Sequence, residues 1–474
     1  MDIMGETSEE RCRHCIRLAR GDELARPTTP LAVSPFSGAT DSISIMRLPY
    51  EILSDIFTRA IAADGCYTIR RMPLHPLLTF RITCKYWYHT VASNRLLWSH
   101  IDISFSNCHG NMYRFHIGNS TRLWLQHSKA GPIHLHFVLG YGDSHILTSE
   151  LLQIFRPYSN HISAVTFSHQ WPEELVRDVL ELCCNHAVPG TLKHLAVAEA
   201  FELEDVKTDY ERWKWPVGFL RGLSSLHIGR LDDAIGFSMN QLWTILVNSP
   251  HLRILQLKGQ HIASSDCIEN YNLPAVPLYS LRVLELENIQ ESELLQLLQT
   301  ILTGKSRLHF GLSVEICDPT ILAAAKTFMK RSRIVSLGLG EDGIAIAKDF
   351  SGVPELHTLH FDLNHGYWES IDLLVDLATA TPKCSTIQRL HFTNGHIYGE
   401  PDRELIRSIV NAYNLKELYF VGFMVQAKGY CTNWRQGDRG EEKELISWLA
   451  QRVDIVSVSY SSPSWDLLAE KQVL

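Results

Sequence analysis

The chain has 474 residues, 45% hydrophobic and 20% charged, with a formal net charge of −8. This composition is that of an ordinary globular protein, and without a basic stripe it argues against a nucleic-acid-binding protein. No apolar run is long enough to span a membrane, and the first ten residues lack the basic and apolar parts of a secretory signal. The eleven cysteines are scattered and odd in number, which indicates a reducing compartment, cytoplasmic or nuclear.

Residues 1–42 are polar and become rich in Pro, Ser, Thr and Gly toward their end. Such a segment buries too little apolar surface to fold, so we expect it to be disordered. Cys12, His14 and Cys15 could form half of a zinc site, but no second Cys-x-x-Cys pair stands near them. We therefore predict no bound metal.

Residues 43–105 carry two helical patterns. Pro49 suits the first turn of a helix, and behind it Ile52 and Ile56, like Leu53 and Phe57, are spaced four residues apart. A second helical stripe and a short apolar cluster follow, formed by Phe80, Cys84, Trp87, Val91, Leu97, Trp98 and Ile101. Two or three short helices of this size are only marginally stable, so another surface should cover part of their apolar face.

This pattern resembles the F-box, whose signature begins Leu-Pro-x-Glu-Ile-Leu-x-x-Ile-Phe and continues with Cys-(Lys/Arg)-x-Trp and Leu-Trp-x-x-Ile. The resemblance implies docking on a Skp-type adaptor and, through it, on a cullin ubiquitin ligase. The implied adaptor-binding residues are Leu48, Pro49, Glu51, Ile52, Leu53, Ile56, Phe57, Cys84, Trp87, Leu97 and Trp98. The spacer between Ala60 and Pro76 is long for the family and should form a loop. An ordinary helical bundle with a chance Leu-Pro start is the alternative.

From residue 120 to about 460 the phrase apolar-x-x-apolar-x-apolar recurs, and with two weaker alternating strands counted the starts lie 22 to 31 residues apart, with one step of 38. It begins at Ile162, Leu192, Leu223, Leu252, Leu281, Ile334, Leu356, Ile387, Leu415 and Val453, and weaker alternating strands begin at Ile133 and Leu308. Helical patterns lie between the phrases at 172–187, 239–248, 291–303, 369–380, 402–413 and 440–451. Strand and helix alternating at a fixed period indicate a repeat protein.

The phrase resembles the leucine-rich repeat, although Gln260, Ile289 and Gly395 stand where that family carries Asn or Cys. The predicted fold class is therefore an α/β repeat: a short helical F-box module, then a leucine-rich-repeat-like solenoid with parallel strands on its concave side and helices on its convex side. The solenoid should end near residue 460, before a tail at 461–474. A doubly wound α/β domain is the alternative, but about a dozen strands is many for one open sheet.

The segment 121–137 is similar to one found in the large F-box families of mushroom-forming fungi.

Two motifs suggest nucleotide chemistry. Residues 338–343 read Gly-Leu-Gly-Glu-Asp-Gly, a dinucleotide fingerprint in form, but its acidic residues would repel a pyrophosphate. Gly304, Lys305 and Ser306 resemble the end of a phosphate loop, but they follow a predicted helix, whereas a phosphate loop precedes one. We therefore discard the phosphate-loop interpretation. No catalytic constellation stands out, and we expect neither enzymatic activity nor a cofactor.

The polar positions on the predicted strands form the candidate target-binding surface, because the concave faces of repeat proteins often bind partners. These residues are His227, Gln256, Lys258, Glu285, Glu287, His360, Asp362, Arg389, His391, Glu417 and Tyr419. We predict a substrate-recognition subunit of a Skp–cullin–F-box ligase, acting as a monomer within the hetero-complex. The alternatives are a repeat scaffold outside the ligase and, remotely, a nucleotide-binding enzyme that uses the 338–343 glycines.

Overall fold

The computed structural model describes residues 48–64, 76–104, 119–128, 131–138, 151–201, 215–231, 238–259, 274–313, 318–340, 353–362, 375, 386–394, 396–398, 400–413, 415–421, 424–427, 430–433 and 440–459. The predicted disordered segment, the tail and nearly all of the helix expected at 369–380 lie outside these residues. Within them, no helix has the length and apolar character needed to cross a membrane. The chain divides into two compact units, here called the helical unit and the sheet unit, which we describe separately.

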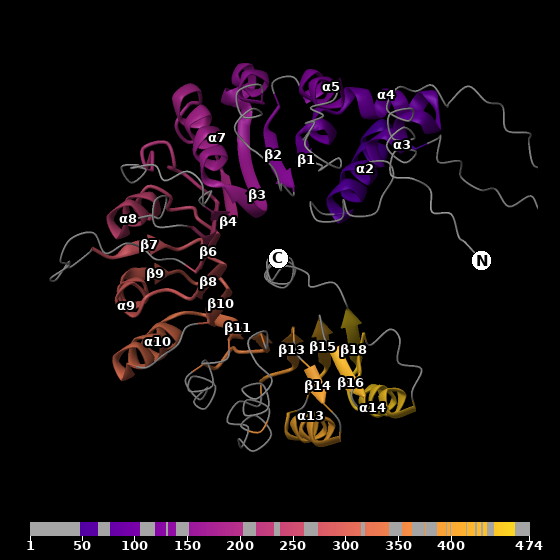
Figure 1. The fold of residues 1–474 in the computed structure, drawn as a ribbon, viewed down its shortest axis with the longest axis vertical. Coiled ribbons are helices and arrows are strands. Elements are labelled where there is room, and N and C mark those ends of the chain that lie inside the picture. Colours follow the sequence, from indigo (N-terminus) through magenta and orange to yellow (C-terminus); the bar gives the residue numbers. More distant parts are fainter. Residues whose placement is uncertain are drawn as a thin grey trace, which may run out of the picture. The chain divides into compact units, whose positions relative to one another are not determined.

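The helical unit comprises the N-terminal helices and the segment that follows them. Its elements are α2 (Tyr50–Asp64), α3 (Pro76–Thr83), α4 (Lys85–Ser93), the short 3₁₀ helix η3 (Arg95–Trp98) and α5 (Asn119–Ser128) (Figure 1). The helix α2 starts directly after Pro49, whose carbonyl accepts from the Leu53 amide at 3.0 Å. It continues through residues 60–64, so the first part of the predicted loop is helical instead.

The single helical stripe expected from Phe80 to Val91 is interrupted. Cys84 has an extended backbone and ends α3, and its sulfur accepts from the Trp87 amide as the N-cap of α4. The prediction was wrong here because apolar residues can keep a helical spacing across a one-residue break. The break itself depends on the extended backbone of the capping residue, which the spacing does not reveal. Phe80 and Cys84, although four residues apart, therefore do not lie on one face of a single helix.

Aromatic side chains build the core of the helical unit. Phe57 stacks on Phe80 with ring centroids 4.3 Å apart, and Trp87 meets the Phe57 ring edge-on at 4.9 Å. Trp98 is fully buried, and its indole Nε1 donates to the Val91 carbonyl at 2.7 Å. A buried indole needs such a partner, so this bond fixes η3 against α4.

The sheet unit is built on one sheet of thirteen strands. In spatial order they are β1 (His100–Ser104), β2 (Ile133–Val138), β3 (Ile162–Pro172), β4 (His194–Phe201), β5 (Ser225–Arg230), β6 (Ile254–Lys258), β8 (Val283–Glu287), β10 (Leu308–Ser313), β11 (Ile334–Leu339), β12 (Thr358–Asp362), β13 (Arg389–Thr393), β15 (Glu417–Val421) and β18 (Ile455–Ser459). Every pairing from β2 to β18 is parallel. Each predicted apolar phrase coincides with a strand, whereas β1 was not predicted.

The helices of this unit lie on one face of the sheet (Figure 1). They are α7 (Glu173–His186), α8 (Met239–Val247), α9 (Glu291–Thr300), α10 (Pro319–Arg331), α13 (Glu400–Ala412) and α14 (Gly440–Ala450), with a 3₁₀ turn η4 (Arg156–His161) before β3. The helix α10 was not predicted. The helix expected at 291–303 ends at Thr300, because Ile301–Thr303 forms a strand, β9, beside β7 (Val276–Leu278). Three further short strands form a separate sheet: β14 (His396–Tyr398), β16 (Met424–Ala427) and β17 (Tyr430–Asn433).

The core lies between the sheet and its helices. In the phrases that begin from Ile162 to Leu415 the second and third apolar positions are buried there, for example Leu255 and Leu257 on β6, and Phe392 stacks between Phe361 and Phe420 on neighbouring strands. The strands follow chain order across the sheet without the reversal that marks a doubly wound domain. A large parallel sheet with helices is consistent with an α/β repeat-like fold.

Candidate functional site

The first candidate surface lies on α2. Leu53 and Phe57 point into the helical unit and are almost completely buried, whereas Ile52 and Ile56 are 50% and 41% exposed. The two pairs lie on different sides of the helix, as their spacing requires. Exposed isoleucines four residues apart form an apolar stripe that water does not favour, and such a stripe commonly marks a partner-binding site.

The other predicted adaptor-binding residues divide in the same way. Pro49 and Glu51 are exposed, and Leu48, Cys84 and Trp87 are half-buried. Leu97 and Trp98 are buried in the unit's own core. Leu53, Phe57, Leu97 and Trp98 therefore support the module from inside and offer almost no surface to a partner.

Sequence reasoning missed part of this exposed apolar surface. Tyr50, Ile82, Tyr88 and Leu96 are also large hydrophobic side chains with more than a third of their surface exposed. They belong to α2, α3, α4 and η3, so every helix from α2 to η3 contributes at least one. Helical spacing alone could not identify them, because which face of a short helix turns outward depends on the helices that pack against it.

The second candidate surface is the polar face of the sheet. The strand register aligns one residue from each of eight neighbouring strands, β5 to β15, in a row, here called the central row: His227, Gln256, Glu285, Gly311, Gly338, His360, His391 and Tyr419. Four predicted target-binding residues of this row are buried, namely Gln256, Glu285, His360 and His391. Their burial leaves these four predicted residues little surface to offer a target. His227, Lys258, Glu287, Asp362, Arg389, Glu417 and Tyr419 remain partly exposed.

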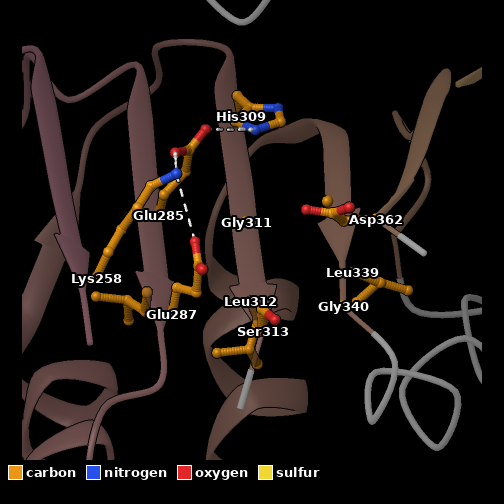
Figure 2. Close-up of a pocket in the computed structure, with 12 residues that line it drawn as sticks. Lys258, Glu285, Glu287, His309, Gly311, Leu312, Ser313, Leu339, Gly340 and Asp362 are labelled. Atoms are coloured by element: carbon orange, nitrogen blue, oxygen red, sulfur yellow. Dashed lines mark ion pairs between the residues drawn. The ribbon is translucent and has the colours of Figure 1, made fainter. Parts of the chain in front are cut away.

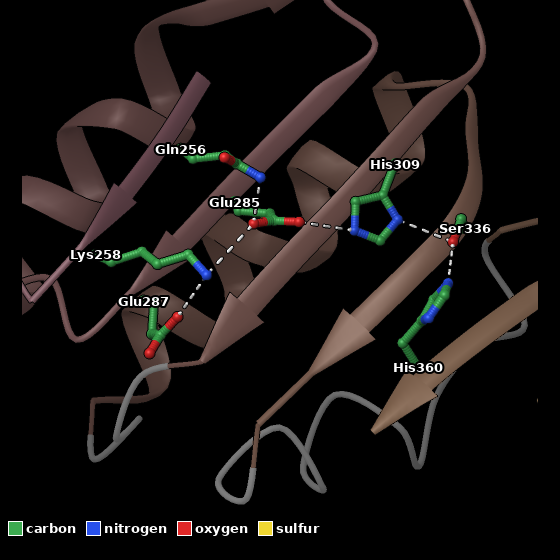
Figure 3. Close-up of polar contacts among 7 residues, drawn as sticks. All are labelled: Gln256, Lys258, Glu285, Glu287, His309, Ser336 and His360. Atoms are coloured by element: carbon green, nitrogen blue, oxygen red, sulfur yellow. Dashed lines mark hydrogen bonds and ion pairs between the residues drawn. The ribbon is translucent and has the colours of Figure 1, made fainter. Parts of the chain in front are cut away.

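The buried polar groups are linked across the strands (Figure 3). Gln256 Nε2 donates to Glu285 Oε2 at 2.7 Å. Lys258 Nζ lies 3.8 Å from the same oxygen and 3.3 Å from Glu287 Oε2. His309 Nε2 lies 3.4 Å from Glu285 Oε1. The Glu285 carboxylate thus lies between three neighbouring side chains, which compensates for its burial.

The network continues through two residues that sequence reasoning missed. The hydroxyl of Ser336 lies 2.9 Å from His309 Nδ1 and 3.0 Å from His360 Nε2, so it joins two buried imidazoles. His309 and Ser336 stand two residues before Gly311 and Gly338. Residues two apart on a strand face the same side, so strand alternation would have identified both.

Stacked rings complete the network toward β15. The His391 ring lies between His360, at 4.3 Å, and Tyr419, at 4.2 Å between centroids. The Tyr419 hydroxyl donates to Glu417 at 2.9 Å, and Arg389 Nε lies 2.9 Å from the other oxygen of Glu417. At this end of the face, the Arg389, Glu417 and Tyr419 side chains therefore bind one another while they remain partly exposed.

Burial and charge shift the titration of two of these groups. Burial would raise the pKa of Glu285, but the hydrogen bond and charge of His309, followed by Lys258, hold that pKa below its ordinary value. Burial, helped by Arg389 and His309, lowers the pKa of His391 to about 3. Near neutral pH the face therefore holds an ionised carboxylate and a neutral imidazole.

A pocket with about 440 Å³ of empty space, part of which is open solvent, lies where the central row holds its two glycines (Figure 2). Its lining includes three carboxylates, from Glu285, Glu287 and Asp362, and one ammonium group, from Lys258. A methyl group on Gly311 would approach Glu285 Cγ to 2.8 Å, closer than packing allows. The Glu285 side chain therefore occupies the space that a side chain at Gly311 would need, whereas a methyl group on Gly338 would meet nothing nearer than 3.4 Å, so room remains over Gly338.

The pocket also bears on the glycine motif at 338–343. Gly338 lies within β11 and Gly340 follows its last residue, and both line the pocket, whereas residues 341–343 lie outside the described part of the chain. Phosphate groups bind where backbone amides and positive charge converge. A lining with three carboxylates disfavours them.

Comparison with known families identifies one region. Residues 45–104 match the F-box-like family. No curated protein matches the chain. The family match covers α2, α3, α4, η3 and β1, and so includes the stripe of Ile52 and Ile56.

Proposed function

We propose that this chain is a substrate-recognition subunit of a Skp–cullin–F-box ubiquitin ligase. The exposed pair Ile52 and Ile56, inside a segment that matches the F-box-like family, is the observation that carries the proposal. F-box domains typically bind Skp-type adaptors, and the exposed side chains of α2 supply the apolar contacts such docking needs. A cullin would be reached through that adaptor.

The sheet unit would select the target protein. We propose that it is a leucine-rich-repeat-like domain, as its recurring apolar phrases and chain-order parallel strands support, and that it resembles those of the fungal F-box families. The chain would not itself be an enzyme and would need no cofactor. It would accelerate ubiquitin transfer by holding the target near the catalytic subunits, because proximity alone is a large rate effect.

A repeat scaffold outside the ligase is the second candidate, because the sheet could bind a partner whether or not the helical unit engages an adaptor. A nucleotide-binding enzyme is the weakest candidate, since carboxylates surround the glycines it would need. Capture of the adaptor separates the first two candidates.

The decisive experiment is co-purification with a Skp-type adaptor. In the double variant Ile52→Asp/Ile56→Asp, capture should fall at least about tenfold. The variant replaces two apolar side chains, which would lose water on docking, with charged carboxylates that would have to be desolvated. Both positions are exposed, so the variant should still fold. The matched control is Val188→Asp, an exposed apolar position in the sheet unit, which should capture normally. Undiminished capture by the double variant, or no capture by the unaltered chain, would contradict adaptor docking.

A further inference from the structure

Two glycines, Gly311 and Gly338, interrupt the polar side chains of the central row and line the pocket. Along the row, bulky polar side chains occupy Gln256 and Glu285 on one side and His360 on the other. Between them Gly311 and Gly338 pair directly in register and carry no side chains. Both glycines line the pocket, and the room for a side chain from another molecule lies over Gly338, because the Glu285 side chain takes the space over Gly311.

Carboxylates stand on both sides of this floor. Figure 2 shows Glu285, Glu287 and Lys258 on one side of Gly311 and Asp362 on the other. Asp362 Oδ1 accepts from Asn394 Nδ2 at 3.0 Å, which orients the group. Within the described residues, no cationic side chain pairs with Asp362. Its remaining oxygen can accept a new donor.

The other side of the pocket shows what kind of group fits. The protein's own Lys258 ammonium lies against Glu285 and Glu287, so the site already holds one cation. The buried Glu285 carboxylate already lies against Gln256, Lys258 and His309, so it adds negative charge to the pocket wall but no free acceptor.

We propose that this pocket binds an arginine side chain of the target protein. A guanidinium group carries five donors in a plane, so it can lie on the glycine backbone and reach carboxylates on two sides. Three carboxylates, against the Lys258 ammonium and the His309 imidazole, leave the pocket negative, which attracts a cation and repels an acidic segment. This inference rests on the proposed function, because it names the chemistry by which the sheet unit would recognise its target.

The test uses the full-length chain and a small probe, Nα-acetyl-arginine methylamide, followed by ligand-observed NMR. The matched probe is the citrulline analogue, which has the same shape without the charge. We expect saturable binding of the arginine probe and no saturable binding of the citrulline probe. Asp362→Asn, which keeps an oxygen for Asn394, should weaken arginine binding by about tenfold, the effect of one charge-assisted hydrogen bond.

Two further variants separate shape from charge. Gly338→Leu should abolish binding by filling the floor without altering a charge, and melting temperature reports whether it folds. Glu355→Gln removes an exposed carboxylate outside the pocket, where it pairs with Arg333, and should bind the probe normally. Equal binding of both probes, or unchanged arginine binding in Asp362→Asn, would overturn the proposal. Adaptor capture is a separate readout, so failure here is distinguishable from failure of ligase docking.

Discussion

At the residue scale, the buried histidines make stability depend on pH. His391 is 1% exposed, and burial lowers its pKa from the ordinary 6.5 to about 3 in the folded chain. Below pH 6.5 the unfolded chain therefore binds a proton that the folded chain excludes, and stability falls as the pH drops toward 3. The lowered pKa of Glu285 acts in the same direction below about its unfolded value of 4.5.

The resulting prediction is that His391 alone lowers the unfolding free energy by about 2 kcal/mol between pH 7 and pH 5. His391→Phe should remove that part of the loss, because phenylalanine can still stack between His360 and Tyr419 but cannot bind a proton. Urea unfolding at both pH values measures it. His251→Phe, at an exposed position, should retain the pH dependence of the unaltered chain. An identical loss in His391→Phe would show that the imidazole does not contribute.

At the element scale, local caps decide where helices begin. Ser238 accepts from the Gln241 amide at 3.3 Å, and Gln241 Oε1 accepts from the Ser238 amide at 2.9 Å, which closes a capping box at the start of α8. Such reciprocal bonds satisfy amides that no earlier turn can bind.

Ser238→Ala should therefore lower the unfolding free energy by about 1 kcal/mol, the usual effect of losing a cap. Ser238→Thr is the matched control, because threonine keeps the hydroxyl, and it should restore most of the stability. Equilibrium urea unfolding measures both. If alanine and threonine behaved alike, the cap would not stabilise α8.

At the scale of the whole molecule, the sheet is held by neighbours in chain order. Leu284 on β8 is completely buried and sits between the partner residues Leu255 on β6 and Phe310 on β10. Each strand bonds only to the strands beside it, as in repeat proteins, so a cavity in one strand weakens its neighbours first.

Leu284→Ala should lower stability by about 2–5 kcal/mol through its cavity. Hydrogen exchange should accelerate most in β6, β8 and β10 and least in β2 and β18. Ser313→Ala, a polar change at the end of β10, is the control and should leave exchange in β2 and β18 unchanged. Uniform acceleration across all thirteen strands would instead indicate one cooperative unit.

The sequence by itself determined the positions of the strands from β2 to β18 in the large sheet and the F-box-like segment, because apolar periodicity and dense motifs are local properties. It also placed Ile52 and Ile56 opposite the buried pair Leu53 and Phe57, without showing which pair faces outward. Only packing against α3 and α4 decides that.

The tertiary structure alone decided the polar face. Glu285, Gly311, Gly338 and His360 come from four strands, and the register that aligns them depends on hydrogen bonds between segments about 22 to 27 residues apart. Burial of His360 likewise follows from side chains on adjacent strands. Neither the register nor the burial can be predicted from a residue's neighbours along the chain, so the sequence did not show that the predicted target-binding row contains a buried network beside a pocket.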